Sequence, residues 1–356
     1  MRLLRAMFWS NTVILVSAAS MIFLGRHEDR IRLVLISARD SLFTSFSSDV
    51  SRLNLTQADL SRTGFLQDSE AGRAFWRTKL DVIPEVVSPL EAAATSPDDI
   101  ALAKAIVLSF SVGGGTGEQI YFMDWPERIR RARRGGGLCS DHTKLFMALA
   151  ELVSLSAREV QNGKHAFVDF FSPRRQKWVF VDPLYAVMAT DGRGTYLSSV
   201  ELRYRGLHDM PIHFVFFGTS PRHIRTEEDV RLKAYYGDRK VLARYVLTNG
   251  NNVATQASVG FVPWVPWEVR ELYLYLSAQR PQYIQFVDES TESGEITIVQ
   301  RTRLLVLGIV GYFAVSLILY PLLCAAGRVG RRGSRLPPGN ARATIVGGGR
   351  LFGPRP

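Results

Sequence analysis

The stretch GGGLCSDHTKLFMALAEL, residues 135–152, decides how the middle of this chain folds. The apolar side chains of this stretch and of the next residue recur at i, i+1, i+4, i+7 and i+8, and they are Leu145, Phe146, Leu149, Leu152 and Val153. This single apolar stripe predicts a helix over residues 140–153, with Ser140 or Asp141 capping its start. The three glycines before it let the chain turn sharply, because glycine has no Cβ to restrict the backbone.

Cys139 stands at the start of this helix. The N-terminal end of a helix is electropositive, which lowers the pKa of a thiol and favours the nucleophilic thiolate. The other cysteine, Cys324, lies in an apolar segment near the C-terminus, where we expect it to pack, so Cys139 has no disulfide partner in the region between. A lone buried cysteine is usually a packing residue, so a nucleophilic role depends on what surrounds it.

Two short runs after the helix alternate like strands, HAFVDFF and WVFVD, residues 165–171 and 178–182. If the intervening SPRRQK closes a simple antiparallel hairpin, Phe171 faces Trp178. This register makes His165 and Asp182 diagonal neighbours, about 7–8 Å apart at the backbone, within reach of an imidazole–carboxylate hydrogen bond. A slip of one residue would break this geometry.

Asp169 is a poorer partner for the histidine. It shares a strand face with His165 but lies four residues along the strand, roughly 13 Å away at ~3.3 Å per residue. A thiol at a helix start, an imidazole and a carboxylate are the parts of a thiol nucleophile activated by an oriented histidine. We therefore predict Cys139, His165 and Asp182 as a catalytic triad.

Each of these residues also has a structural interpretation. Cys139 could be a packing residue, His165 a surface hydrogen-bonding residue, and Asp182 part of an Asp-Pro turn. His142 lies on the predicted helix but off its apolar stripe, so we expect it to be exposed. One cysteine with scattered histidines is a poor zinc pattern, so we expect no metal site and no cofactor.

Two apolar segments, residues 6–24 and 304–326, contain no charged residue. Each is long enough to cross a ~30 Å hydrocarbon core as a helix. The first could be a cleaved signal peptide, but its apolar run is long and no clean A-x-A site closes it, so we expect an uncleaved anchor. The sequence therefore predicts two transmembrane helices.

The basic residues that flank these segments orient them in a membrane. No acid lies in either flank, and the basic residues there are Arg2, Arg5, Arg328, Arg331, Arg332, Arg335, Arg342, Arg350 and Arg355. The positive-inside rule places both termini in the cytoplasm and the central domain outside. These flanks account for most of the formal net charge of +11, so we do not interpret that charge as nucleic-acid binding.

Changes in composition along the chain predict six regions. They are an N-terminal transmembrane anchor (1–25), a stalk or accessory region (26–97), the core (98–220), a β-rich extension of the outer domain (221–303), a transmembrane helix (304–326) and a basic cytoplasmic tail (327–356). Within them we expect a helix at 98–110 that begins at Asp98 or Asp99, and further strands at 213–218, 241–247 and 294–299. The aromatic and proline cluster at 261–268 is either a partner- or membrane-facing surface or core packing.

The central motifs together resemble the transglutaminase-like superfamily, a branch of the papain-like cysteine enzymes. That family shows G-x-C-x-D before a helix, an Ala-Arg pair, a histidine with an aromatic residue two positions on, and W-x-x-x-D-P. The matching residues here are Gly137, Cys139, Asp141, Ala157, Arg158, His165, Phe167, Trp178, Asp182 and Pro183. Two positions depart from the family, because Ser154-Leu155-Ser156 replaces the usual Gly-Ile-Pro and Phe167 replaces the usual tryptophan.

The resemblance covers about residues 98–185 and implies an α+β fold in which the nucleophile helix packs on an antiparallel sheet. It implies a cysteine peptidase or amidase, anchored in the bilayer, that acts on peptide or protein substrates outside the cytoplasmic membrane. Trp125 and Gln119, upstream of the nucleophile, are weak candidates for stabilising the oxyanion. Arginine far outnumbers lysine, which is typical of GC-rich bacterial genes and would make the outer compartment periplasmic.

Two other functions remain open at this stage. The chain could be a catalytically silent domain of this fold that serves as a scaffold in cell-envelope or exopolysaccharide assembly, with other assembly proteins as partners. It could also be a protein-glutamine transglutaminase, in which an amine rather than water accepts the acyl group. The sequence does not decide among the three.

Overall fold

The computed structural model divides the chain into two compact units. One unit comprises Met1–Ile31 with Leu304–Pro356, and the other comprises Arg32–Arg303. The structure describes residues 2–48, 70–112, 117–118, 120, 123–162, 164–218, 235–242, 245–248, 253, 273, 283–287 and 293–333. The predicted surface at 261–268 lies outside these residues.

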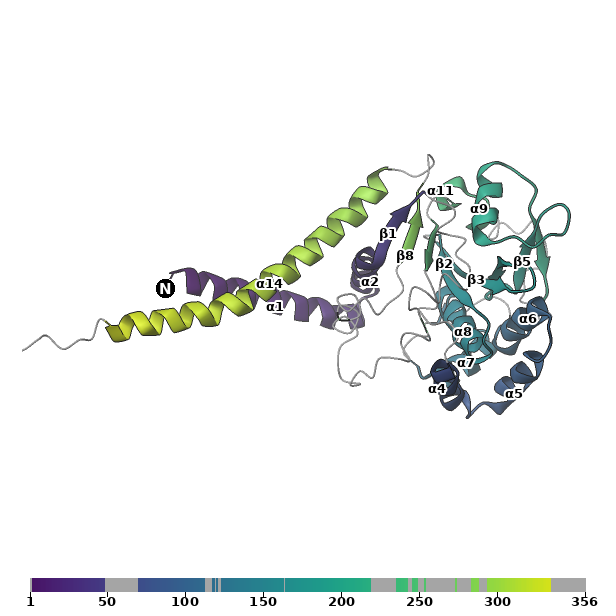
Figure 1. Ribbon diagram of the computed structural model, residues 1–356, viewed down its shortest axis with the longest axis horizontal. Coiled ribbons are helices and arrows are strands. Elements are labelled where there is room, and N and C mark those ends of the chain that lie inside the picture. Colours follow the sequence, from purple (N-terminus) through teal and green to yellow (C-terminus); the bar gives the residue numbers. More distant parts are fainter. Residues whose placement is uncertain are drawn as a thin grey trace, which may run out of the picture. The chain divides into compact units, whose positions relative to one another are not determined.

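The unit Arg32–Arg303 is built on an eight-stranded mixed sheet with the order β1-β8-β7-β2-β3-β4-β5-β6 (Figure 1). The strands are β1 (Thr44–Ser47), β2 (Ala157–Gln161), β3 (Ala166–Ser172), β4 (Lys177–Asp182), β5 (Val187–Thr190), β6 (His213–Phe216), β7 (Val246–Thr248) and β8 (Tyr283–Phe286). β1 pairs with β8 in parallel, and the other neighbours are antiparallel. The α+β class is therefore confirmed, although the sheet is mixed rather than wholly antiparallel.

Helices cover both faces of this sheet. They are α2 (Asp29–Phe43), α4 (Glu70–Leu80), α5 (Pro84–Ala93), α6 (Asp99–Phe110), α7 (Trp125–Arg133), α8 (Cys139–Leu152), α9 (Ser199–Leu207) and α11 (Arg239–Leu242). Val168 and Val181 of the central strands pack with the apolar side chains of α4 to α8. Phe167 and Phe180, which point the other way, pack with Leu202 of α9 and with α11.

The start of α8 is fixed by local hydrogen bonds. Asp141 accepts a 2.9 Å hydrogen bond from the backbone N–H of Leu138, so it caps the helix from its third position. Gly137 has φ +96°, and a Cβ there would lie 3.1 Å from the His142 ring. Glycine is therefore required at this turn by both the backbone and the packing. The predicted helix is confirmed, and it begins at Cys139 itself.

The predictions for the flanking elements had mixed outcomes. The helix at 98–110 is confirmed as α6, with the Asp98 carboxylate accepting from the N–H groups of Ile100 and Ala101. β6 confirms the strand at 213–218, and β7 overlaps only the end of the run at 241–247. The strand at 294–299 is wrong, because these residues begin the long helix α14 (Ser293–Gly333). No glycine or proline separates them from the apolar segment that follows, so the helix extends back through them.

The two regions expected outside the core contribute to it. The region 26–97 supplies β1 to the sheet, and it supplies α4 and α5 to one helical layer. The region 221–303 supplies β7 and β8 to the same sheet. The core of the unit Arg32–Arg303 therefore includes residues both before and after 98–220.

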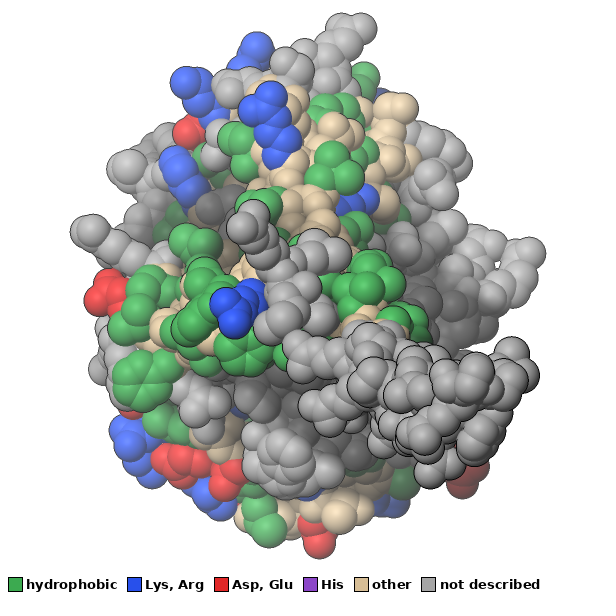
Figure 2. Space-filling view, turned by 90° about the vertical axis from the view of Figure 1, so that its left-hand side faces the viewer, with side chains coloured by type: hydrophobic (Ala, Val, Ile, Leu, Met, Phe, Trp, Pro, Cys, Tyr) green, Lys and Arg blue, Asp and Glu red, His purple; other side chains and the backbone are tan. Residues whose placement is uncertain are grey.

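The other unit contains α1 (Arg2–His27) and most of α14. Among the described residues one candidate membrane span is found, Ile296–Ala326, with a mean hydropathy of 2.2 and 6% of its most apolar window buried. Apolar side chains are exposed on both helices (Figure 2), including Phe8 and Trp9 on α1 and Leu304 and Leu305 on α14. The structure thus supports one membrane-spanning helix, near the C-terminus, by length and composition.

Candidate functional site

Cys139 is the first residue of α8 and is partly accessible to solvent. Its side chain packs against the apolar cluster on the α9 side of the sheet, although most of α8 packs on the opposite side. Leu138 and Ser140, on either side of it, are exposed. Cys139 therefore lies at a helix N-terminus and is partly open to solvent.

His165 and Asp182 are brought together by the β3–β4 hairpin. The predicted register is confirmed, because Phe171 pairs with Trp178. His165 directly precedes β3, Asp182 ends β4, and Nε2 of the imidazole lies 2.7 Å from Oδ2 of the carboxylate. Both side chains are almost fully buried. The hydrogen bond expected from the diagonal geometry is therefore present.

The thiol of Cys139 lies near enough to the His165 side chain and to the backbone N–H of Ala166 for both to lower its pKa. Because Nε2 faces Asp182, Nδ1 is the imidazole nitrogen left for the thiol. Burial raises the pKa of the Cys139 thiol, but the His165 hydrogen bond, the His165 charge and the Ala166 amide outweigh it, so that the pKa is lowered overall.

The His165 imidazole is shifted in the opposite direction. Burial lowers its pKa, but the charge and hydrogen bond of Asp182, together with the bond from Cys139, raise it to about 10. A lowered thiol pKa beside a raised imidazole pKa favours a thiolate–imidazolium pair. Such a pair can attack an electrophilic carbonyl without a separate base.

Asp182 is held by more than the histidine. Its Oδ1 accepts hydrogen bonds from the backbone N–H groups of Leu184 (2.9 Å) and Tyr185 (3.4 Å). Its Oδ2 accepts a 2.6 Å hydrogen bond from the hydroxyl of Tyr236, besides the bond to His165. These donors stabilise the carboxylate in the buried site.

Aromatic rings enclose the imidazole. The Tyr235 ring stacks on it, with centroids 4.5 Å apart and an interplanar angle of 5°. Tyr185, Tyr236 and Phe167 lie 5.6, 6.0 and 6.1 Å away, centroid to centroid. Neither Tyr235 nor Tyr236 was predicted from the sequence, because both lie some 70 residues after His165 in a region with no clear helical or strand periodicity.

Asn162 anchors two parts of this site. Its Oδ1 accepts a 2.9 Å hydrogen bond from the backbone N–H of His165, and its Nδ2 donates a 2.8 Å hydrogen bond to the carbonyl of Tyr235. Asn162 is fully buried at the end of β2. It thereby ties the segment that carries the two tyrosines to the backbone of the histidine.

His142 is fully buried, so the expectation that it is exposed was wrong. Its Nε2 lies 3.0 Å from the carbonyl oxygen of Gly136, and its ring fills the space beside Gly137. Burial lowers the pKa of His142, which favours the neutral ring. The helical stripe could not predict this, because the glycine turn folds back over the helix and buries a second face.

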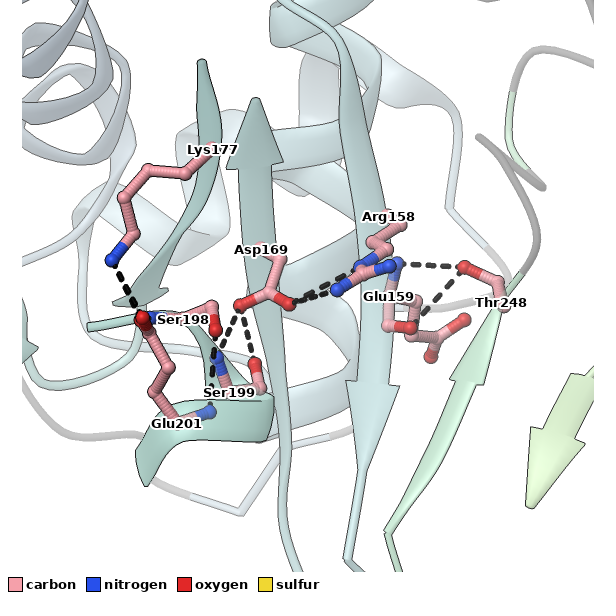
Figure 3. A network of polar contacts seen from close by, with 8 residues as sticks. All are labelled: Arg158, Glu159, Asp169, Lys177, Ser198, Ser199, Glu201 and Thr248. Atoms are coloured by element: carbon pink, nitrogen blue, oxygen red, sulfur yellow. Dashed lines mark hydrogen bonds and ion pairs between the residues drawn. The ribbon is translucent and has the colours of Figure 1, made fainter. Parts of the chain in front are cut away.

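Asp169 belongs to a different network, as expected from its distance along the strand (Figure 3). Its Oδ2 accepts from Nη2 (2.8 Å) and Nε (3.1 Å) of Arg158 on β2. Its Oδ1 accepts from the backbone N–H of Ser199 (2.9 Å) at the start of α9. Asp169 therefore links two strands and a helix by buried contacts and takes no part in the triad geometry.

The two oxyanion candidates gain no support. Trp125 begins α7, where its ring packs 4.7 Å from that of Trp76 and 4.5 Å from the Arg128 guanidinium. These are packing contacts of the helical layer. Gln119 lies outside the described residues.

Comparison with family models, with curated proteins and with solved structures finds no match for this chain.

Proposed function

We propose that this protein is a membrane-anchored, cysteine-dependent acyl-transfer enzyme of the transglutaminase-like type, acting as a peptidase or amidase. The observation that carries the proposal is the position of His165, whose Nε2 contacts the Asp182 carboxylate and whose ring lies near enough to the Cys139 thiol for each to shift the pKa of the other. A packing cysteine would need neither a histidine nor a buried carboxylate behind it. The raised imidazole pKa and the lowered thiol pKa fit the same interpretation.

The proposed reaction has two halves. The Cys139 thiolate attacks the carbonyl carbon of an amide and forms a tetrahedral oxyanion, which collapses to a thioester as His165 gives its proton to the leaving amine. Water then attacks the thioester, His165 takes one of its protons, and the carboxylic acid leaves as the thiolate–imidazolium pair is restored. Asp182 orients the imidazole and stabilises its charged form throughout.

The helix start supplies groups for the oxyanion. The first N–H groups of an α-helix have no partner within the helix, and Cys139 and Ser140 occupy the first two positions of α8. Backbone N–H groups of this kind stabilise negative charge that develops beside a nucleophile. We therefore assign the oxyanion to the α8 N-terminus in place of Trp125.

The proposed location is a bacterial cytoplasmic membrane, with α1 and α14 both spanning it and both termini in the cytoplasm. The apolar exposed surfaces of the two helices support this arrangement, as do their arginine-rich outer flanks. The side chains of Ser10 on α1 and Tyr312 on α14 are hydrogen-bonded, which favours retention of α1 beside α14 over its removal as a signal peptide. The catalytic unit would then act on peptides or proteins in the periplasm.

Trapping of the acyl-enzyme tests the proposed function. The full-length protein in detergent would be incubated with a pool of envelope-derived peptides, quenched with acid, and its intact mass measured. We expect an acyl adduct on Cys139 that is absent from Cys139→Ala and greatly reduced in His165→Ala. Cys324→Ser is the matched control, because it removes the other thiol without touching the site, and it should keep the adduct.

Two other results would contradict a peptidase or amidase function. If no peptide pool yields an adduct or a released amine, while deletion of the gene disturbs the cell envelope and Cys139→Ala does not, the protein is a scaffold. An adduct that is released only by added amines, and not by water, would identify a transglutaminase.

A further inference from the structure

The segment around residues 235–236 contributes two adjacent tyrosines to the candidate site. Tyr235 stacks on the His165 ring, and Tyr236 donates its hydroxyl to the Oδ2 oxygen of Asp182 that also bonds His165. Neither residue belongs to the motifs from which the triad was predicted. One tyrosine thus touches the base and its neighbour touches the residue that orients the base.

We propose that Tyr235 and Tyr236 act as a pair of positioning residues. The Tyr236 hydroxyl fixes the orientation of the Asp182 carboxylate, and the Tyr235 ring shields the His165 ring from water. This inference rests on the proposed function and extends it beyond the three predicted residues. It also gives a role to the segment of chain that returns to the sheet through β7.

Tyr236 is well placed to hold the carboxylate. Its side chain is almost fully buried, and its hydroxyl oxygen lies 2.6 Å from Oδ2 of Asp182. Burial and the nearby Asp182 charge raise its pKa well above the ordinary value, so the hydroxyl stays protonated and remains a donor. The ring is clamped by Phe167 and Phe180, at centroid distances of 5.5 and 5.3 Å, which limits its movement.

Tyr235 is well placed to shield the histidine. Its ring is nearly parallel to the imidazole and covers one face of it, and it is itself partly exposed. Its backbone carbonyl is fixed by Asn162, which also binds the backbone of His165. A ring held in this way excludes water from one side of the thiolate–imidazolium pair, and the attraction between two charges is stronger where water is excluded.

Both contacts are expected to affect the thiol. The titratable groups that face His165 or interact with it are Cys139, His142, Asp182, Tyr185, Tyr235 and Tyr236. If Asp182 loses a donor it can rotate, the imidazole loses its orientation, and its bond to the thiol weakens. If the imidazole face becomes wet, solvent screens the ion pair. Either change moves the titration of Cys139 upward, towards that of a free thiol near ~8.5.

The test is the rate of Cys139 alkylation by iodoacetamide as a function of pH. It uses the full chain in detergent with Cys324→Ser as the parent, so that Cys139 is the only thiol. We expect Tyr236→Phe and Tyr235→Ala each to raise the apparent thiol pKa by roughly half a pH unit or more. Tyr235→Phe keeps the stacked ring and should restore the parent profile.

Two further variants separate positioning from a general structural effect. Tyr245→Phe is the matched control, because Tyr245 is equally buried in the same apolar cluster but is not among the donors to Asp182 described above. It should leave the profile unchanged. In an Asp182→Ala background, Tyr236→Phe should have no additional effect, because its acceptor is gone. Melting temperatures of all variants confirm that the compared proteins are folded.

Failure of the inference can be told apart from failure of the proposed function. If the parent titrates well below a free thiol but Tyr236→Phe and Tyr235→Ala match it, the tyrosines are packing residues and the inference is overturned. The inference also fails if Tyr236→Phe has an equal effect with and without Asp182. If Cys139 of the parent itself titrates like a free thiol, the thiol is not activated, and both the proposed function and this inference are overturned.

Discussion

Nε2 of His165 lies 2.7 Å from Oδ2 of Asp182, and the two residues stand at adjacent ends of the neighbouring strands β3 and β4. The hairpin register places them there, and the donors to Asp182 then hold the carboxylate. Cys139 reaches the same histidine from the start of a helix on the other side of the sheet. The site is thus assembled where a helix N-terminus meets the open end of a hairpin.

Two buried aspartates should respond differently to the same substitution. Asp182→Asn removes the charge that stabilises the imidazolium, so we expect turnover to fall by about 10³- to 10⁴-fold and the thiol pKa to rise. Asp169→Asn leaves the buried Arg158 without its counter-charge, so we expect a loss of about 3–5 kcal/mol of stability with an unchanged thiol pKa. Thermal melting and Cys139 alkylation, measured on both variants, check this contrast. Equal effects of the two variants on the thiol would refute the assignment of Asp182.

Gly137 should be far less tolerant of substitution than another glycine with positive φ. Gly137→Ala combines an unfavourable backbone with a Cβ 3.1 Å from the His142 ring, whereas Gly194→Ala has a similar backbone, φ +80°, and no atom within 4 Å of the new Cβ. We expect Gly194→Ala to cost about 1–2 kcal/mol and Gly137→Ala to cost more. The difference in melting temperature between the two variants measures the destabilisation that comes from the contact between the new Cβ and the His142 ring. If Gly137→Ala melts no lower than Gly194→Ala, the His142 ring moves aside freely.

The proximity of Cys139, His165 and Asp182 could be predicted from sequence because the three residues are close along the chain. Helical spacing placed Cys139 at a helix start, and strand alternation with one short connection placed His165 against Asp182. The partners of the triad could not be predicted in this way. Tyr236 reaches Asp182, and Asn162 reaches Tyr235, through contacts between residues far apart in the chain, and no local pattern encodes which distant segment returns to the sheet.

The same reasoning explains the errors in the fold. Apolar and polar side chains alternate around Ile296 as in a strand, but these residues form the first turns of the long helix α14. β1 pairs in parallel with β8, almost 240 residues away in the sequence. Nothing in the sequence of either segment predicts this pairing. His142 was misplaced because burial of its face comes from the Gly136–Gly137 turn, which lies outside the helical repeat.

The ion pair should make stability depend on pH in a characteristic way. His165, whose pKa is raised to about 10, contributes stability that is complete below ~6.5 and lost as pH rises towards 10. Cys139, whose pKa is lowered from 9.0, contributes stability that is complete above that value and lost as pH falls through its folded pKa. Between the folded pKa of the thiol and pH 9.0 the two trends offset each other, and above 9.0 only the loss of the His165 proton still acts, so the contribution of the pair should fall there.

Thermal melting across pH isolates this contribution. The difference in melting temperature between the parent and the double variant Cys139→Ala/His165→Ala should change little with pH just below 9. It should fall as pH rises from 9 towards 10. A difference that rises or falls steadily across the whole range would mean that only one of the two groups is perturbed.

The central claim is that Cys139 is a thiolate held by His165, and its alkylation rate against pH tests this most directly. The full chain carrying Cys324→Ser would be compared with the same protein carrying His165→Ala. We predict rapid alkylation that persists well below the ~8.5 of a free thiol and is lost at low pH in the His165→Ala variant. A rate that titrates near ~8.5 in both proteins, or a thiol that does not react in either, would contradict the account.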